Sequence, residues 1–154
     1  MHDHLRSTHR IRIPAPADTA FMFFTPAGEA HWVEGWQPAY LWPADGATCQ
    51  GMVFTTGGGD EFTIWQLADF DRDRRRSRYV RTTPGRRAGF VEIQVEPDGP
   101  ADCQVSVCYE MTALADANGD PLAAYRGAGF TAMIDGWQAE IVRRLPQLMR
   151  LTLA

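Results

Sequence analysis

Residues 120–148 read DPLAAYRGAGFTAMIDGWQAEIVRRLPQL, and the apolar residues of this stretch recur at helical spacing. The recurring positions are Phe130, Ile134, Trp137, Ile141, Leu145 and Leu148. Steps of three and four residues place these side chains on one face of an α-helix. The pattern therefore predicts a long helix over about 120–145 that packs on another layer. Because Pro146 lacks a backbone donor, we expect it to kink or interrupt the final turns.

Residues 89–112 read GFVEIQVEPDGPADCQVSVCYEMT and alternate apolar and polar side chains on both sides of a turn at 97–100. Such alternation is typical of antiparallel strands with one covered face and one face in water. The long helix is the element available to cover the apolar face. We therefore expect it to pack over Val105, Val107 and Tyr109.

Glycine, proline and charged turn residues divide the rest of the chain into short elements. The expected elements are a strand at 6–13, short helices at 16–24 and 27–33, and extended segments at 36–42, 52–56, 61–70 and 77–83. The prediction is a single α+β domain over 1–154, in which a curved antiparallel sheet of about seven strands wraps on the C-terminal helix. Residues 1–5 are expected to form a flexible tail.

The composition narrows the function classes. Of the 154 residues 45% are hydrophobic, which is enough for one substantial core. No run approaches the roughly 18 to 20 apolar residues of a membrane span, so we expect no span and a cytoplasmic location. The net charge of −4 argues against a nucleic-acid partner. All 15 basic residues are arginine, and the lack of lysine excludes Schiff-base catalysis through a lysine amine.

Two stretches near the N-terminus carry a family resemblance. IRIPAPAD at 11–18 leads from a strand into an aromatic-rich helix, and FTPAGEAHWVEGW at 24–36 spans the second helix and its turn. With the order of elements, these stretches resemble the helix-grip fold of the SRPBCC superfamily, which includes START, polyketide-cyclase and Bet v 1-like proteins. The resemblance implies a cavity between sheet and C-terminal helix that binds a small hydrophobic molecule, lipid-like or aromatic. Because the superfamily hosts many activities, the fold does not choose among them.

The composition of the expected cavity walls points the same way. Gly127, Gly129 and Gly136 stand in the long helix, where glycine is unfavourable, so they suggest the close approach of a ligand or of backbone. Tight packing of helix on sheet without a void is the alternative. The residues expected to bind the ligand are Trp36, Tyr40, Phe54, Trp65, Tyr109, Phe130, Ile134 and Trp137. For each of them, ordinary core packing is an equally good explanation.

The leading prediction for function is ligand binding without identified chemistry. The first alternative is an enzyme of the polyketide cyclase/dehydratase type, which needs an acid or base inside the cavity. The weak candidates are His31, Arg81 and Glu92. His31 also fits a surface position. Arg81 lies in strand 76–83, for which the sequence does not determine which side chains face inward, and Glu92 lies among the polar, outward-facing side chains of its strand. The second alternative is an interaction protein that resembles the chaperone-ATPase activators of the same fold. It requires a filled core and an exposed docking patch.

Cysteine and histidine positions give no sign of a metal or redox site. The three cysteines are Cys49, Cys103 and Cys108. We expect free thiols, because the count is odd and the last two have opposite parity in one strand. His2, His4 and His9 lie at the expected tail, so the sequence predicts neither a metal site nor a cofactor.

Two further stretches are expected to be simple turns. The glycines at 57–59 precede a strand rather than a helix, so they indicate a hairpin turn and not a phosphate loop. The basic run at 72–78 is interleaved with acids at a hairpin tip, which favours a solvated turn over a binding surface. The sequence leaves both a monomer and a homodimer open.

Overall fold

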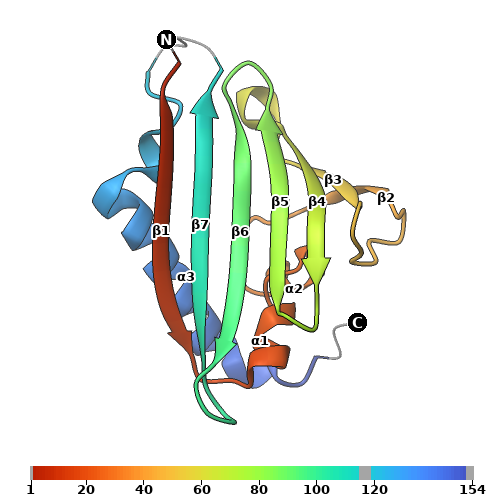
Figure 1. Ribbon diagram of the computed structural model, residues 1–154. Coiled ribbons are helices and arrows are strands. Elements are labelled where there is room, and N and C mark those ends of the chain that lie inside the picture. Colours follow the sequence, from red (N-terminus) through yellow and green to blue (C-terminus); the bar gives the residue numbers. More distant parts are fainter. Residues whose placement is uncertain (1, 115–118, 152–154) are drawn as a thin grey trace.

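The computed structural model describes residues 2–114 and 119–151, and its main layer is a seven-stranded antiparallel sheet in the order β1-β7-β6-β5-β4-β3-β2 (Figure 1). The strands are β1 (His4–Ile13), β2 (Ala39–Trp42), β3 (Val53–Thr56), β4 (Thr63–Asp71), β5 (Arg76–Thr83), β6 (Arg87–Pro97) and β7 (Cys103–Ala113). The helices are α1 (Ala17–Met22), α2 (Pro26–Glu29) and α3 (Gly127–Leu148), with short 3-10 turns η1 (Gly59–Glu61) and η2 (Ala123–Tyr125). The predicted α+β helix-grip class is confirmed.

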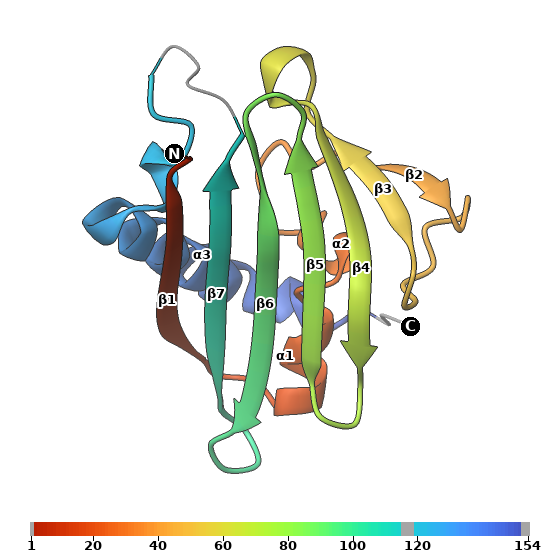
Figure 2. The ribbon, with the colours of Figure 1, turned by 45° about the horizontal axis from the view of Figure 1, so that its top comes forward.

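The long helix α3 lies against one face of the sheet and crosses behind β1, β7 and β6 (Figure 2), with its main strand contacts on β1. Its buried side chains are Phe130, Ile134, Ile141 and Leu148, which belong to the stripe predicted from the sequence. Val105 and Val107 are fully buried on β7, and the Tyr109 ring meets the Phe130 ring edge-on at 5.5 Å. The prediction that the helix packs over this face is confirmed.

Some element ends differ from the prediction. The helix begins at Gly127 rather than near 120, because residues before it form the separate turn η2. It runs to Leu148 with Pro146 in its last turns, so the proline does not end it, and the Met149 N–H donates to the Leu145 carbonyl at 2.9 Å. At the other end, His4 already pairs with Thr112 of β7. Residues 4 and 5 therefore belong to the sheet and not to a flexible tail.

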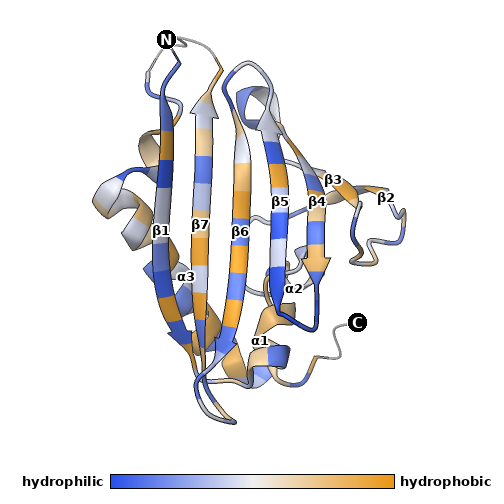
Figure 3. Cartoon of the chain, viewed as in Figure 1, coloured by the Kyte–Doolittle hydropathy of each residue, from blue (hydrophilic) through white to orange (hydrophobic). Residues whose placement is uncertain are grey.

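The strands alternate as predicted, and the structure settles the one parity that the sequence left open. Along β7 each second residue is buried, and the hydropathy bands on β6 and β7 alternate in the same way (Figure 3). On β5 the buried residues are Ser77, Tyr79, Arg81 and Thr83. The odd-numbered side chains of β5, Arg81 among them, thus face the interior.

The glycines of α3 do not mark a close approach, so that prediction is wrong. Gly127, Gly129 and Gly136 are exposed, and a Cβ at any of them would meet open space. The close approaches lie elsewhere: a Cβ at Gly28 would collide with the Met22 carbonyl, and one at Gly89 with the Glu110 carbonyl. Periodicity alone could not show this, because a glycine on the outer face of a helix has the same local sequence as one at a contact.

Side-chain hydrogen bonds hold the corner between α1 and α2 in one conformation. Thr25 caps α2, since its hydroxyl accepts from the Gly28 N–H at 3.0 Å and donates to the Met22 carbonyl at 2.8 Å. The buried Trp32 ring donates from Nε1 to the Phe23 carbonyl at 2.8 Å. Residues 30–33 continue α2 as hydrogen-bonded turns. Because Gly28 lets α2 approach α1 so closely, the next residue, Glu29, is held at the interior.

Candidate functional site

A cavity of about 240 Å³ lies between the inner face of β3–β7, the segment from α2 to residue 36, and the middle of α3. Its wall carries six aromatic rings, which belong to Trp36, Phe54, Trp65, Tyr79, Tyr109 and Trp137. The aliphatic part of the lining is formed by Val33, Val91 and Ile93. The cavity is therefore mostly apolar, as is typical of a small-molecule site.

Three rings of the cavity wall, Phe54 on β3, Trp65 on β4 and Trp36 before β2, pack against one another. Phe54 and Trp65 are cross-strand partners and stack with their centroids 5.7 Å apart and their planes 5° from parallel. Trp36 packs edge-on against both rings at 6.0 and 5.8 Å, and its Nε1 donates to the Pro26 carbonyl at 3.0 Å. The Trp65 Nε1 donates to the Thr56 hydroxyl at 2.9 Å. Rings fixed in this way cannot turn to fill the space beside them.

Five of the eight residues expected to bind a ligand line this cavity, namely Trp36, Phe54, Trp65, Tyr109 and Trp137. Three do not. Phe130 and Ile134 are buried beneath the first half of α3, where they complete the core against β7. Tyr40 packs on the far side of Phe54, with its ring over Gly46. That the five lining residues contact a ligand stays a prediction.

Arg81 is the charged side chain that the inward face of β5 brings to the cavity. It is only 8% exposed, and its Nε is buried without a hydrogen-bond partner in the part of the chain described. The guanidinium carbon lies 4.7 Å from the Trp65 ring centroid and 5.5 Å from that of Tyr125. These rings offer cation–π contacts, but they do not supply a counter-charge.

Arg87, on the neighbouring strand, is buried in a different way. Its two terminal nitrogens donate to both carboxylate oxygens of Glu61 at 2.8 and 3.1 Å, and its Nε donates to the Pro121 carbonyl at 2.7 Å. The hydrogen bond from Arg87 is the main cause that holds the pKa of Glu61 below its ordinary value. Glu61 lines the cavity, yet its carboxylate is committed to Arg87.

Among the lining residues that sequence reasoning missed are the titratable residues Glu29, Glu61 and Tyr79, and Glu29 is the one with a carboxyl that has no ion pair in the described residues. Burial raises the pKa of its carboxyl well above the ordinary value, so the group is held in its protonated form over a wider pH range than a surface glutamate. The neighbouring His31 drew attention instead, because an imidazole titrates near neutral pH. Nothing in the local sequence marks Glu29 as a cavity residue, because its position depends on the packing of α2 on α1, which approach closely at Gly28.

The buried tyrosines of the cavity are neutral. Burial is the main cause that raises the pKa of Tyr79 and of Tyr109 above the ordinary value, and the nearby Glu29 adds to it in both cases. For Tyr109 the positive charge of Arg81 acts in the opposite direction. The Tyr79 hydroxyl donates to the Phe24 carbonyl at 3.1 Å. These groups can exchange hydrogen bonds with a ligand, but they bring no negative charge.

Of the three weak catalytic candidates, only Arg81 lines the cavity. His31 is exposed, and its carbonyl accepts a hydrogen bond from Arg144 of α3 at 3.2 Å. Glu92 lies on the outer face of the sheet, where it pairs with Arg78 at 3.2 Å. The Glu92 side chain thus points outward, as the sequence favoured.

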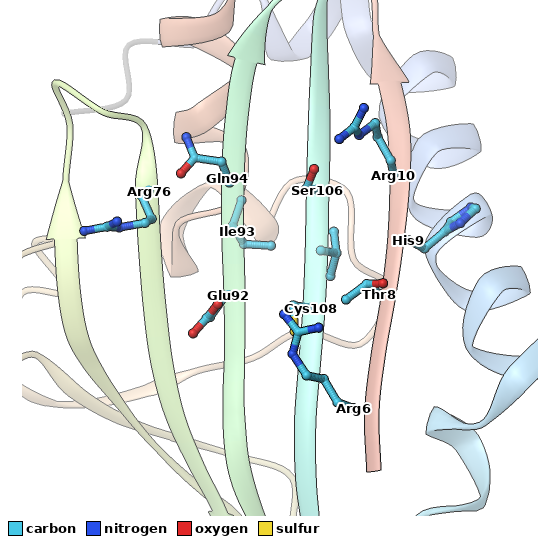
Figure 4. A pocket seen from close by; sticks show the side chains of 11 residues that line it. Arg6, Thr8, His9, Arg10, Arg76, Glu92, Ile93, Gln94, Ser106 and Cys108 are labelled. Carbon is cyan, nitrogen blue, oxygen red and sulfur yellow. The ribbon is translucent and has the colours of Figure 1, made fainter.

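A second hollow of about 570 Å³ lies on the outer face of the sheet, between β1 and β5 (Figure 4). Its floor consists of small polar side chains, Thr8, Ser106 and Cys108, and Arg6 and Arg10 stand beside them on β1. No aromatic wall surrounds it, so a ligand there would remain in contact with water. For this reason the inner cavity is the candidate functional site.

The cysteines and histidines form no reactive cluster in the chain as described. Cys49, Cys103 and Cys108 are free thiols, which confirms the prediction, and burial raises the pKa of Cys103 to about 11. His9 lies in β1, not in a tail, and its Nε2 lies 2.7 Å from a carboxylate oxygen of Asp135. Within 2–114 and 119–151, no three His, Cys, Asp or Glu side chains are grouped to hold a metal ion.

Comparison with known sequences bears directly on this fold and cavity. The profile of a family described as polyketide cyclase / dehydrase and lipid transport matches residues 4–149. The chain belongs to this family. The match covers β1 through α3, so the SRPBCC, Bet v 1-like resemblance inferred from two short stretches holds over nearly the whole chain. No curated protein matches the chain by sequence.

Solved structures of the same fold include norcoclaurine synthase from Thalictrum flavum, at 13% identity and a TM-score of 0.66, with 96% of this chain and 97% of that chain covered. The Zhui aromatase/cyclase from Streptomyces sp. R1128 matches at 16% identity and a TM-score of 0.64, with 93% and 96% covered. A protein from Thermobifida fusca matches at 21% identity and a TM-score of 0.64, with 92% and 94% covered. At these identities the likeness concerns the fold. No helix in the described residues is long and apolar enough to cross a membrane.

Proposed function

We propose that this member of the polyketide cyclase / dehydrase and lipid transport family binds a small, largely aromatic molecule in the inner cavity. The observation that supports the proposal is the wall of six aromatic rings around a cavity, beside a core whose side chains are buried. The cavity is slightly smaller than the roughly 300–1,000 Å³ of typical drug-sized pockets, which favours a ligand of one or two rings. Planar rings would pack against this aromatic wall.

The test is a titration followed by tryptophan fluorescence, because Trp36, Trp65 and Trp137 border the cavity. Fatty acids, flavonoids and two-ring aromatics serve as probes, with thermal melts alongside. We expect a saturable change with at least one aromatic probe and a higher melting temperature in its presence. Trp137→Ala should weaken that response, whereas Trp42→Ala should not, since Trp42 is 57% exposed and does not line the cavity. A well-folded protein that responds to no probe would overturn the proposal.

A catalytic role is supported by one specific observation, the buried carboxyl of Glu29 in the same cavity as Arg81. A protonated carboxyl can donate to a carbonyl oxygen while water removes an α-proton, and a guanidinium can stabilise the negative charge that develops on that oxygen. An aryl methyl ketone that binds in the cavity should then exchange its α-protons for deuterium faster than in buffer. Exchange that is equal in wild type and Glu29→Gln would remove Glu29 from the reaction.

The interaction-protein alternative receives less support. It required a filled core, and the cavity departs from that requirement. Its second requirement is an exposed apolar or charged docking patch, and the neighbouring exposed apolar side chains on the edge strand β2 are Leu41 and Trp42. A patch of this size is common on monomeric proteins.

A further inference from the structure

Arg81 is the feature of the cavity that apolar ligand binding does not explain. A buried charge is normally neutralised by a partner, because the loss of hydration is costly. Arg87 shows the usual solution, with two contacts to Glu61 and one to a backbone carbonyl. Within the residues described, no carboxylate lies within 4 Å of the Arg81 side chain. Its Nε donor has no acceptor either.

The nearest acidic groups are not available to Arg81. Both carboxylate oxygens of Glu61 bind Arg87, and one of them also lies 3.2 Å from Arg86. Glu29 lines the same cavity, but its burial favours the neutral acid. Arg81 therefore has no carboxylate within ion-pair distance in the described residues, although its charge still acts on the more distant Glu61 and adds to the Arg87 hydrogen bond in lowering the pKa of that carboxyl.

The position of Arg81 restricts what can supply that negative charge. The side chain is 8% exposed and lines the cavity, so an anion must enter the cavity to reach it. The rings of Trp65 and Tyr125 lie beside the guanidinium, at 4.7 and 5.5 Å from its carbon. A guanidinium presents its donors as a planar fork that matches the two oxygens of a carboxylate.

We propose that the cavity binds a small aromatic carboxylic acid, whose carboxylate pairs with Arg81 while its ring lies among Phe54, Trp65 and Trp137. The proposal rests on the proposed function and sharpens it, since it names the ligand class. A ligand of this class satisfies both halves of the site. Its apolar ring meets the aromatic wall, and its negative charge meets the Arg81 guanidinium, which has no ion-pair partner among the described residues.

The test compares two probes of nearly equal shape, 2-naphthoate and 2-naphthamide, by tryptophan fluorescence and calorimetry at neutral pH. Charge-assisted hydrogen bonds in a buried site are worth more than neutral ones, so naphthoate should bind roughly 10- to 100-fold more tightly. Arg81→Met should abolish that preference and leave naphthamide binding nearly unchanged. Arg81→Lys should restore part of the preference, because it returns the charge without the fork.

Arg78→Gln is the matched control. Arg78 belongs to the same strand but to its outer face, where it pairs with Glu92, so its loss should leave the preference for naphthoate intact. Naphthamide binding as tightly as naphthoate in the wild type would overturn the aromatic-acid proposal while the aromatic-ligand function stands. Binding of neither probe, nor of any other aromatic, would overturn both. A preference that persists in Arg81→Met, or in Arg81→Gln if the first variant does not fold, would mean that another group holds the carboxylate.

Discussion

The inner face of the sheet is divided into two halves that are built differently. On α3, the side chains of Phe130, Ile134 and Ile141 face the sheet and leave at most 2% of their surface exposed, and the Phe130 ring contacts Tyr109 of β7. Beneath α2, the face is lined by rings and by Arg81, and a cavity remains. Rings occur in both halves, but around the cavity Phe54, Trp65 and Trp36 pack on one another and leave space beside them. The two halves of a continuous sheet therefore differ in how their side chains are arranged.

The two buried arginines differ in the same manner. Arg87 is enclosed by partners that use its Nε and both terminal nitrogens, while Arg81 is enclosed mainly by rings. Burial alone therefore does not distinguish a structural cation from a binding cation. The distinction lies in whether the protein itself supplies the acceptors.

The largest expected effect is on the free energy of unfolding when an isoleucine is replaced by alanine in each of the two halves. Ile134 is fully buried under α3, and Ile93 is 2% exposed but lines the cavity. Ile134→Ala should lower the free energy of unfolding by about 4 kcal/mol, and Ile93→Ala by about 2 kcal/mol, because one side of Ile93 already lacks packing partners. Urea unfolding measures both. Equal losses would contradict the division into a packed and a hollow half.

The next effect compares the two arginines. Arg87→Met should cost about 2 kcal/mol, since it breaks hydrogen bonds to a carboxylate and leaves the Pro121 carbonyl without its donor. Arg81→Met should change stability by less than about 1 kcal/mol, or raise it, because it removes a buried charge that has no partner. Thermal and urea unfolding of both variants decide the comparison. A larger loss for Arg81→Met would show that Arg81 is the structural cation of the pair.

A pH effect should come from Glu29. Its folded-state pKa is raised by burial, so its contribution to stability is complete below the ordinary glutamate pKa and is lost as the pH rises through the raised value. Above the ordinary pKa, the wild type should therefore lose stability relative to Glu29→Gln, by at most about 1.4 kcal/mol per pH unit. Unfolding curves between pH 4.5 and about pH 8 measure the difference. Glu34→Gln, at an exposed position, should run parallel to the wild type.

The smallest effect is chemical. Thiol titration of the denatured, unreduced protein should give three thiols per chain, and a value of one would reveal a disulfide. In the native protein Cys103 should react last, because it is fully buried and its pKa is raised to about 11. Cys49 and Cys108 are partly exposed and should react first. Early labelling of Cys103 would indicate that the packed half opens readily.

The fold was predictable where the sequence is periodic. The stripe from Phe130 to Leu148 and the alternation on β7 each repeat often enough to identify a helix and a strand. On β5 the sequence RSRYVRTT has no such alternation, so the direction of Arg81 could not be deduced. That direction depends on the pairing with β4, which itself shifts register between Leu67 and Asp69.

The site was predictable only in its apolar part. Large aromatics are buried in most folds, and five of the predicted lining residues do border the cavity. Their separation from Phe130 and Ile134 depends on where α3 crosses the sheet, which no local pattern encodes. Glu29 could not be found because its burial is a tertiary effect of the α1–α2 contact at Gly28.

The pairing of β1 with β7 has a consequence for how the chain is made. β1 hydrogen-bonds to β7 alone, and its first pair joins His4 to Thr112 across 108 intervening steps of sequence. During synthesis, β1 is made well before β7 and must wait for that strand before it can pair. Contacts of such long range slow folding, because the entropy of closing the loop is lost before the contacts form. β1 therefore stays unpaired until β7 has been synthesised, and the sheet is completed only after that.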